Sequence, residues 1–447
     1  MGTKQGDHVF YRDLHRDYPR LVRGEGIYLY DADGKRYIDG SSGALVCSLG
    51  HGNREIADHL RIQAETLDFV PIARFTHGPQ IELAERLARL GSADLPYAYF
   101  VSGGSEAVET AIKMARQYHL ERGERGRFLV IAREPSYHGN TIACLAAGGH
   151  PGRRRNYEPY LMPSPKIRLP HCASCPYNLQ YPSCDLHCAN VLESEITGAG
   201  AENVSCFLFE TITGSCGGVI VPPPGYFGRI AEICRRHGVV ILADEVMCGA
   251  GRTGPFLASS RFESMPDILI LGKGITAGYS PLAALLVSER IYRGFEDGSG
   301  AFVNNYTFAA NPLSCAAACT VLEIVERDGV LDRVIPAGLY LQSRLIQLAG
   351  RHPQLGGVVR AAGLMLALDV YRDREKMEPF PAEEKVGEKL ARACLDEGLV
   401  IYPALLALAD GHGDCFLLGP PLTITVAEID ELVARLGRAV ARVFPAA

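Results

Sequence analysis

Short apolar runs alternate with stretches of helical spacing between residues 100 and 290, and this alternation constrains the fold more than any other feature of the chain. The apolar runs are residues 128–132, 206–209, 239–243, 268–271 and 283–287. Helical spacing is found at residues 105–120 and 225–237. Strands that alternate with helices are typical of a mostly parallel sheet, so we expect an α/β domain in this region.

The chain has 447 residues, more than one hydrophobic core normally holds, and we expect two domains. Residues 27–38 predict a β-hairpin, and the end of the chain predicts long helices with one or two strands. We expect residues 1–74 and 326–447 to form a smaller α+β domain. Residues 75–325 then form the large domain, with residues 169–190, rich in Cys, Pro and Tyr, as an insertion.

Composition and charge exclude some classes of protein. Hydrophobic residues make up 47% and charged residues 21% of the chain, as is usual for globular proteins. The net charge of -6 gives no basic field, so we expect no nucleic-acid partner. No apolar run approaches the roughly 18 residues of a membrane span, and the first twenty residues lack an apolar signal segment. We therefore expect a cytoplasmic protein without membrane contact.

A glycine turn before the first predicted helix has the features of an anion site. Ser102, Gly103, Gly104 and Ser105 follow the apolar residues Phe100 and Val101. Free N–H groups at a helix N-terminus bind phosphates, and glycines let the backbone approach them closely. The alternative interpretation is an ordinary helix cap made by Ser102 or Ser105.

Two further strand ends carry an acid and a lysine. Asp244 ends the run 239–243, where a carboxylate can hold a protonated ring nitrogen; the alternative is that it caps the next turn. Lys273 lies between Gly272 and Gly274 after the run 268–271. A desolvated lysine has a lowered pKa and forms imines with aldehydes, although a solvated loop lysine is the alternative. Because ligands collect at the carboxyl ends of strands, we expect all three sites to converge.

The sequence resembles the class III (ornithine/GABA/omega type) pyridoxal-phosphate (PLP) dependent aminotransferases from about residue 24 to residue 422. The motifs that carry the resemblance are Asp31-Ala32-Asp33-Gly34, Leu49-Gly50-His51, Ser102 to Ala107, Tyr137-His138-Gly139, Asp244-Glu245-Val246, Gly251-Arg252-Thr253-Gly254, Gly272-Lys273-Gly274 and Tyr306-Thr307-Phe308. The resemblance implies a PLP-transferase fold, in which a large domain with a mostly parallel sheet adjoins a smaller α+β domain.

The resemblance also implies roles for individual residues. Lys273 is expected to hold PLP as a Schiff base, Asp244 to hold the pyridinium, and Glu210 to lie near the Schiff base. Tyr137 and Val246 are expected on the two faces of the ring. The remaining cofactor-binding positions are Gly103, Gly104, Ser105, His138, Met247 and Thr307. Because Thr307 is expected to reach the phosphate of a neighbouring subunit, the resemblance implies a homodimer with shared active sites.

Three departures from the family pattern bear on specificity. Met247 stands where many relatives have a glutamine, and Gly103 stands where serine is frequent. The range 400–420 contains no arginine, although relatives that act on α-amino acids usually have one there to bind a carboxylate. Arg360 and Arg74 are the substitutes that we consider.

Four of the fourteen cysteines form a cluster in the insertion: Cys172 and Cys175 are spaced C-x2-C, and Cys184 and Cys188 are spaced C-x3-C. Four thiolates at this spacing predict a closed zinc site or an iron–sulfur cluster. Reduced thiols in an ordinary loop and disulfides are the alternatives. The neighbouring His171 and His187 are further candidate ligands.

The leading functional hypothesis is a transaminase with a ping-pong cycle. It moves an amino group from an amine or omega-amino acid donor to a 2-oxo acid acceptor, with Lys273 as the attachment point of the cofactor and the proton carrier. One alternative is a PLP aminomutase or racemase on the same scaffold. The other is a non-catalytic binding protein stabilised by a metal.

Overall fold

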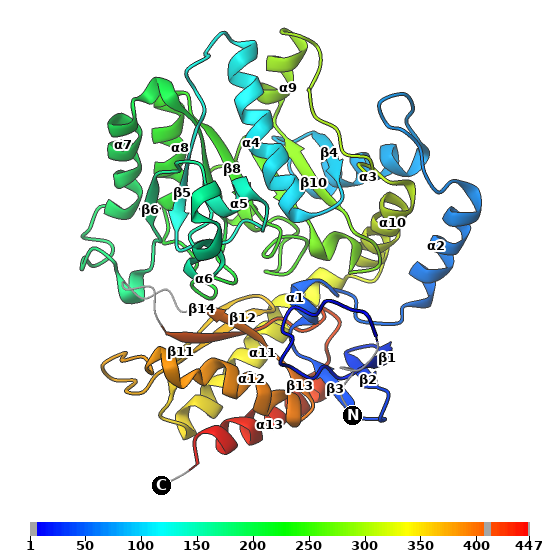
Figure 1. The fold of residues 1–447 in the computed structure, drawn as a ribbon, viewed down its shortest axis with the longest axis vertical. Coiled ribbons are helices and arrows are strands. Elements are labelled where there is room, and N and C mark those ends of the chain that lie inside the picture. Colours follow the sequence, from blue (N-terminus) through cyan, green and yellow to red (C-terminus); the bar gives the residue numbers. More distant parts are fainter. Residues whose placement is uncertain (1–6, 406–412, 446–447) are drawn as a thin grey trace.

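The computed structural model describes residues 7–405 and 413–445, which form two lobes (Figure 1). The upper lobe in Figure 1 is built on a seven-stranded sheet of order β4-β10-β9-β8-β7-β5-β6. Its strands are β4 (Tyr97–Val101), β5 (Leu129–Glu134), β6 (Lys166–Arg168), β7 (Val204–Glu210), β8 (Val240–Asp244), β9 (Ile268–Leu271) and β10 (Ala283–Val287). Five neighbouring strands run parallel, and β10 is antiparallel to both β4 and β9.

Helices cover both faces of the large sheet, because successive side chains of each buried strand point to opposite faces. Ile268 and Ile270 of β9 pack with α4 (Gly104–Glu121), whereas Leu269 and Leu271 pack on the opposite face. That opposite face is covered by α3 (Gly78–Leu90), α7 (His187–Ala199), α8 (Tyr226–His237) and α10 (Pro312–Arg327). The shorter helices of this lobe are α5 (Ile142–Ala147), α6 (Pro151–Arg154) and α9 (Glu289–Glu296).

The lower lobe joins the two ends of the chain (Figure 1). One four-stranded sheet, β1-β2-β3-β13, contains the predicted hairpin, and β13 pairs with β3 in parallel through Leu399 and Ile38. A second, antiparallel sheet has the order β11-β12-β15-β14. The strands are β1 (Leu21–Glu25), β2 (Tyr28–Asp31), β3 (Arg36–Asp39), β11 (Leu355–Ala362), β12 (Met365–Val370), β13 (Leu399–Val400), β14 (Tyr402–Leu405) and β15 (Asp414–Leu418). Helices α11 (Val330–Arg351), α12 (Val386–Asp396) and α13 (Val426–Val443) complete the lobe.

The expected α/β fold with a mostly parallel sheet and a second, smaller lobe is confirmed. The antiparallel β10 was not predicted, because strand direction is not visible in a short apolar run. The predicted domain limits at residues 74 and 325 stay a prediction. Within the first segment, α1 (Ser42–Leu45) lies between the lobes in Figure 1, and α2 (Arg54–Thr66) packs against α10, where His59 Nδ1 lies 2.9 Å from Thr320 Oγ1.

Helix boundaries follow local sequence signals. Asn53 caps α2 by accepting a hydrogen bond from the Ile56 N–H at 3.2 Å, and Thr425 begins α13 with a capping box to Glu428. Asn311 caps α10, whose first residue is proline, as is frequent at the start of a helix. In the part of the chain that the structure describes, no helix is long and apolar enough to cross a bilayer.

Candidate active site

Two carboxylates and a lysine meet at the carboxyl edge of the large sheet. Glu210 ends β7, Asp244 ends β8, and the two are direct register partners on these parallel strands. Asp244 in turn pairs with Ile270 of β9, and Lys273 follows the end of that strand by two residues. Two of the three sites predicted from strand ends, Asp244 and Lys273, therefore lie at the same edge of the sheet, as parallel strand topology requires.

Asp244 has one carboxylate oxygen for a local turn and one for the interior of the site. Its Oδ1 accepts a hydrogen bond from the Val246 N–H at 3.0 Å, so the turn cap suggested by the sequence exists. Its Oδ2 lies 2.9 Å from Nδ1 of His138, and both side chains are buried. Since an ionised carboxylate has about four acceptor positions, Asp244 retains acceptor capacity for a further cation.

Lys273 has the environment of a reactive amine. Burial lowers its pKa, and the nearby Asp244 and Glu210 oppose this effect. Among the described residues, no carboxylate forms an ion pair with its Nζ. The residue has a positive φ of 45° directly after Gly272, which places it at the sharp start of a 3₁₀ turn. A lowered pKa favours the neutral amine, which is the form that condenses with carbonyl groups.

Glu210 holds the loop that carries Tyr137. Its Oε1 accepts a hydrogen bond from the Tyr137 N–H at 3.0 Å, and its Oε2 accepts one from the Gly214 N–H at 3.0 Å. Burial raises the pKa of Glu210; the charge of His138 opposes this rise, and the charge of Asp244 adds to it. Glu210 thus connects two loops at the sheet edge, because its carboxylate accepts a hydrogen bond from a backbone N–H group of each loop.

The glycine turn leaves the N-terminus of α4 open. Gly103 is the N-cap residue, and no side chain caps the helix, so the alternative of a serine cap is wrong. Ser105 Oγ instead accepts a hydrogen bond from the Asn140 N–H at 3.1 Å. The first N–H groups of α4 and the helix dipole therefore remain available for an anion. A Cβ on Gly104 would lie 3.0 Å from Cγ1 of Val246, so a larger residue here would force the Val246 side chain to shift.

These residues fit a phosphate-bearing aldehyde with a ring nitrogen. The open helix N-terminus suits its phosphate, Lys273 with its lowered pKa suits its aldehyde, and Asp244 suits a protonated ring nitrogen. Val246 lies against both Gly104 and Gly272, between the anion site and the lysine. The buried Nε2 of His138 has no hydrogen-bond partner among the described protein atoms. It is therefore a further polar group that a bound molecule could contact.

Two other predicted residues lie in different surroundings. Met247 is 8% exposed and packs in the core against Gly214, where a Cβ would clash with the Met247 sulfur. Thr307 is exposed on the strandless segment before α10, within which Val303 and Phe308 are also exposed. Within one chain Thr307 is thus at the surface, and its predicted contact with a second subunit stays a prediction.

The two arginines considered for substrate carboxylates have other positions. Arg360 pairs with Asp369, with Nη2 at 2.6 Å from Oδ1, and its Nε donates to the Gly218 carbonyl at 2.6 Å. Arg74 is exposed on the surface of the single chain. Arg360 is therefore occupied by internal partners.

Arg153 is a site residue that the sequence did not indicate. Its Cζ lies 4.4 Å from the centre of the Tyr137 ring. Burial raises the pKa of Tyr402, and the positive charge of Arg153 opposes this rise, so Arg153 lies near both tyrosines. Among the described residues, no carboxylate pairs with Arg153, whereas its neighbour Arg154 is bound to Glu158 at 3.3 Å. Nothing in the sequence distinguishes one from the other.

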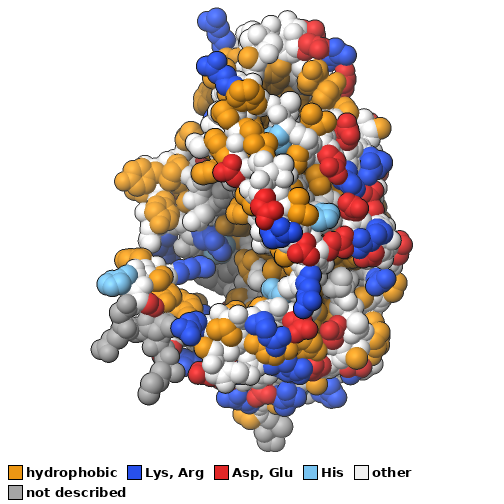
Figure 2. Space-filling view, turned by 90° about the vertical axis from the view of Figure 1, so that its right-hand side faces the viewer, with side chains coloured by type: hydrophobic (Ala, Val, Ile, Leu, Met, Phe, Trp, Pro, Cys, Tyr) orange, Lys and Arg blue, Asp and Glu red, His pale blue; other side chains and the backbone are white. Residues whose placement is uncertain are grey.

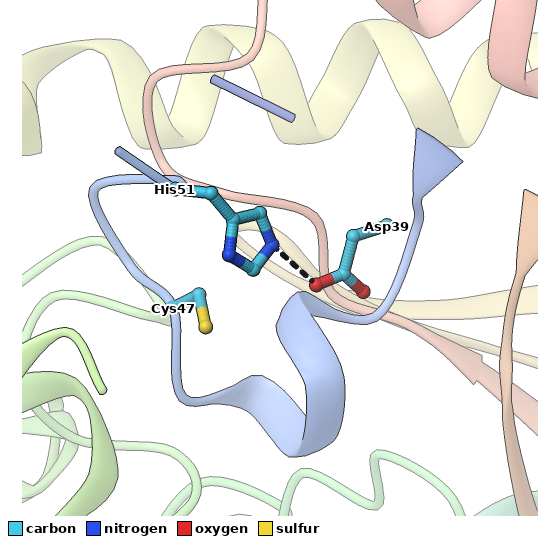
Figure 3. A group of neighbouring side chains, drawn as sticks. All are labelled: Asp39, Cys47 and His51. Atoms are coloured by element: carbon cyan, nitrogen blue, oxygen red, sulfur yellow. Dashed lines mark hydrogen bonds and ion pairs between the residues drawn. The ribbon is translucent and has the colours of Figure 1, made fainter. Parts of the chain in front are cut away.

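A separate group of polar side chains lies in the N-terminal segment (Figure 3). Asp39, Cys47 and His51 have ligand atoms within 4.8 Å of one another. His51 Nε2 lies 3.0 Å from Asp39 Oδ2, and this bond, with a further contribution from Cys47, raises the pKa of His51 to about 9. Nε2 of His51 is thus engaged by Asp39, and this contact joins the end of β3 to the loop that follows it.

The fold and the residues at this sheet edge fit a PLP-dependent aminotransferase. The chain belongs to the class-III aminotransferase family, whose model matches residues 13–440. It is therefore an enzyme, and the interpretation as a non-catalytic binding protein is wrong.

Individual relatives agree with this assignment. The chain is 36% identical over 434 residues to an uncharacterised aminotransferase, YodT, of Bacillus subtilis, and the match covers 96% of this chain and 97% of that protein. An (S)-enantioselective omega-transaminase of Thermomicrobium roseum superimposes with a TM-score of 0.90 at 35% identity, covering 99% and 97% of the two chains. An amine transaminase of an uncultivated Pseudomonas species, solved in its PLP-bound form, gives 0.89 at 34% identity, covering 98% and 97%.

Proposed function

We propose that this aminotransferase moves an amino group from a primary amine or omega-amino acid to a 2-oxo acid, in a ping-pong cycle centred on Lys273. The observation that carries the proposal is the convergence of three groups at one sheet edge. A lysine with a lowered pKa, the carboxylate of Asp244 and the uncapped N-terminus of α4 all lie there. The amine transaminases among the similar structures are consistent with the donor class.

Some of these residues bind the cofactor, and Lys273 also transfers a proton. PLP, when bound, supplies an aldehyde for condensation with amines and a ring that withdraws electrons from the neighbouring carbon. Gly104 and Ser105 bind its phosphate, and Asp244 keeps the ring nitrogen protonated. The Nζ of Lys273 takes a proton from the donor carbon that carries the amino group. It then delivers this proton to the carbon of the cofactor's aldehyde group. Tyr137 and Val246 hold the ring plane, and Glu210 fixes the Tyr137 loop.

Arg153 is the residue that we assign to the carboxylate of the acceptor or of an omega-amino acid. It lies over Tyr137, it has no carboxylate partner among the described residues, and Arg360 is already paired. An arginine held against an aromatic ring keeps its planar donors directed outward for a bidentate contact. Neutral amines need no such contact, so the same site accommodates both donor types.

The active unit in this proposal is a homodimer. Val303, Phe75 and Phe308 are 79%, 64% and 60% exposed, and Phe69 contacts Phe308 at a ring-centre distance of 6.0 Å. Figure 2 shows hydrophobic side chains gathered along one edge of the molecule. An exposed apolar surface next to the polar Thr307 is typical of a subunit interface. A partner would cover it and bring Thr307 to the second active site.

The test separates a transaminase from an isomerase. Purified enzyme loaded with PLP is mixed with a primary amine, with and without a 2-oxo acid, and amine consumption is followed over many turnovers. A transaminase consumes one amine equivalent per cofactor without the acceptor and continues only when the acceptor is added. Continued conversion of the substrate to an isomer without any acceptor would instead establish the aminomutase or racemase alternative.

A further inference from the structure

The four cysteines of the insertion line one small cavity between β6 and α7. Cys172 lies in the 3₁₀ turn Cys172–Ser174, and Cys175 directly follows it. Cys184 precedes α7, and Cys188 is in its first turn. Their side chains surround a cavity of about 20 Å³. A space of this size holds one water molecule or one ion.

These four thiols differ from the other cysteines of the chain. Nine of the other ten cysteines are buried, and Cys47 is partly buried. A single buried cysteine behaves as a small hydrophobic residue, which accounts for those nine. Cys172 is exposed and its three companions are partly buried, and none of the four is in a disulfide. Packing in a hydrophobic core does not explain a partly exposed group of four.

The thiols also influence one another electrostatically. Burial raises the pKa of Cys188 to about 11, and the neighbouring Cys172, Cys184 and Cys175 each raise it further. Burial likewise raises the pKa of Cys172, with contributions from Cys175 and Cys184. These mutual effects show that the four thiols lie near one another.

The two histidines beside the cluster have other contacts. His171 Nδ1 accepts a hydrogen bond from the Ser174 N–H at 2.9 Å. His187 lies edge-on to the Tyr177 ring at a centre distance of 4.8 Å. The sulfur atoms are therefore the complete ligand set that the cavity offers without disturbing these contacts.

We propose that Cys172, Cys175, Cys184 and Cys188 bind one Zn²⁺ ion in a closed tetrahedral site. Each thiol releases its proton to solvent as it binds the ion, and no electron is transferred. Zinc accepts four thiolates at about 2.3 Å, and the two close pairs, C-x2-C and C-x3-C, are typical of such sites. The cavity accommodates a single ion better than a multinuclear cluster.

Binding draws the sulfur atoms together. Four ligands at about 2.3 Å from one ion lie about 3.8 Å apart. In the described part of the chain, only the Asp39, Cys47 and His51 group has three ligand atoms within 4.8 Å of one another. The cysteine side chains therefore rotate toward the cavity and the turns of residues 172–188 tighten. Metal-binding energy thus becomes local folding energy of the insertion.

The zinc site has a structural role at the contact between the lobes. His171, next to Cys172, is buried within reach of the charges of Arg360 and Asp369, which belong to the small-lobe strands β11 and β12. The insertion has little regular structure of its own between β6 and α7. A metal that fixes these turns therefore fixes where His171 meets the small lobe, without touching Lys273.

The first experiment measures metal in the full-length enzyme purified without chelators. We expect about one zinc ion per chain, no labile sulfide, and no loss of zinc when PLP is removed. Wild-type protein that contains no zinc and takes up none from added zinc sulfate would overturn the proposal. Iron with labile sulfide in its place would overturn the assignment of the ion.

The second experiment compares Cys184→Ser and Cys188→Ser with Cys47→Ser. The two ligand variants should lose most of the zinc, and amide hydrogen exchange should rise across residues 172–188, whereas Cys47→Ser should retain about one zinc per chain. Zinc lost from Cys47→Ser but kept by the ligand variants would place the metal in the Asp39 group and refute the proposal. Because metal content is measured independently of turnover, failure of the proposed transamination leaves this result interpretable.

Discussion

The guanidinium carbon of Arg153 lies 4.4 Å from the centre of the Tyr137 ring. The two residues come from different segments, since Tyr137 follows β5 and Arg153 is in the short helix α6. A cation over an aromatic face is stabilised by about 0.5–1 kcal/mol when exposed. This contact places a positive charge beside the ring that we expect to stack on PLP, where we propose that it binds substrate carboxylates.

Replacing Arg153 with Gln should weaken the use of substrates with a carboxylate more than the use of neutral amines. We expect KM for a 2-oxo acid to rise by roughly tenfold to a hundredfold, because a charged hydrogen bond is worth about 1.5–3 kcal/mol. The rate of cofactor conversion by a neutral primary amine should change less than about threefold. Arg155→Gln is the matched control, because Arg155 is exposed in the same segment. Equal losses for both substrate types would contradict carboxylate binding by Arg153.

Asp244 and Glu245 are adjacent carboxylates with different expected functions. Glu245 accepts hydrogen bonds from the Ala258 N–H at 2.6 Å and the Ser259 N–H at 2.7 Å, so it holds the 3₁₀ turn Ala258–Arg261 in place. Asp244→Asn should reduce turnover by roughly a hundredfold or more with little change in melting temperature. Glu245→Gln should instead cost about 1–3 kcal/mol of stability. The pair is measured by steady-state kinetics and thermal unfolding. Near-normal turnover of Asp244→Asn would leave Asp244 as a turn cap only.

Lys273→Ala should abolish covalent retention of PLP and turnover while the fold persists. Burial lowers the pKa of Lys273, and among the described residues no carboxylate forms an ion pair with its Nζ, so its removal breaks no ion pair. The measurement is cofactor absorbance after desalting, together with circular dichroism. The matched control is Lys113→Ala, on the exposed side of α4, where the ammonium bonds to Asn304. Sustained transamination by Lys273→Ala would exclude Lys273 as the attachment point.

Sequence patterns predicted the candidate residues that follow strands, but not the candidate residues that loops and short helices bring to the same place. Asp244 and Lys273 were predictable because each ends an apolar run, and the carboxyl ends of parallel strands share one edge. Arg153 was not predictable, because it follows no strand and resembles Arg154 and Arg155 in the sequence. Its role depends on the path of the loop after Tyr137, which local propensities do not determine.

The small lobe shows the same limit. The hairpin at residues 28–39 followed from its turn residues and alternating apolar side chains. The parallel pairing of Leu399 with Ile38 joins residues more than three hundred positions apart, and short β13 has no distinguishing pattern. The internal hydrogen bonds of Arg360 were also not predictable from the sequence. Its partner Asp369 lies on the neighbouring strand, and its carbonyl partner Gly218 lies in the loop after β7.

The exposed apolar segment before α10 predicts the assembly. Val303→Asp places a charge on a residue that is 79% exposed, so a monomer should tolerate it. If a second copy covers this surface, the variant should dissociate in analytical ultracentrifugation and bind PLP more weakly. Phe128→Asp is the control, because Phe128 is also exposed, at 61%, but directly precedes β5 and lies outside the segment before α10. A wild-type enzyme that sediments as a monomer would contradict the shared active site.

The ion pair between His51 and Asp39 predicts how stability depends on pH (Figure 3). The pKa of His51 is raised to about 9 in the folded protein, chiefly by its hydrogen bond to Asp39, against about 6.5 in the unfolded chain. Because the folded state holds this proton more tightly, the pair stabilises the fold fully below about pH 6.5. That contribution declines as the pH rises through about 9.

His51→Gln should therefore be destabilised most at low pH. We expect a loss of roughly 2–3 kcal/mol relative to wild type at pH 6, and a smaller loss at pH 10, where wild-type His51 is also neutral. His15→Gln, which removes an exposed imidazole, should match wild type at both values. Urea unfolding at the two pH values measures the difference, and the comparison between variants cancels the other groups that titrate in this range. A His51→Gln deficit that stays constant or grows between pH 6 and pH 10 would show that the imidazole acts by packing alone, because only a protonated His51 loses its advantage as the solution becomes basic.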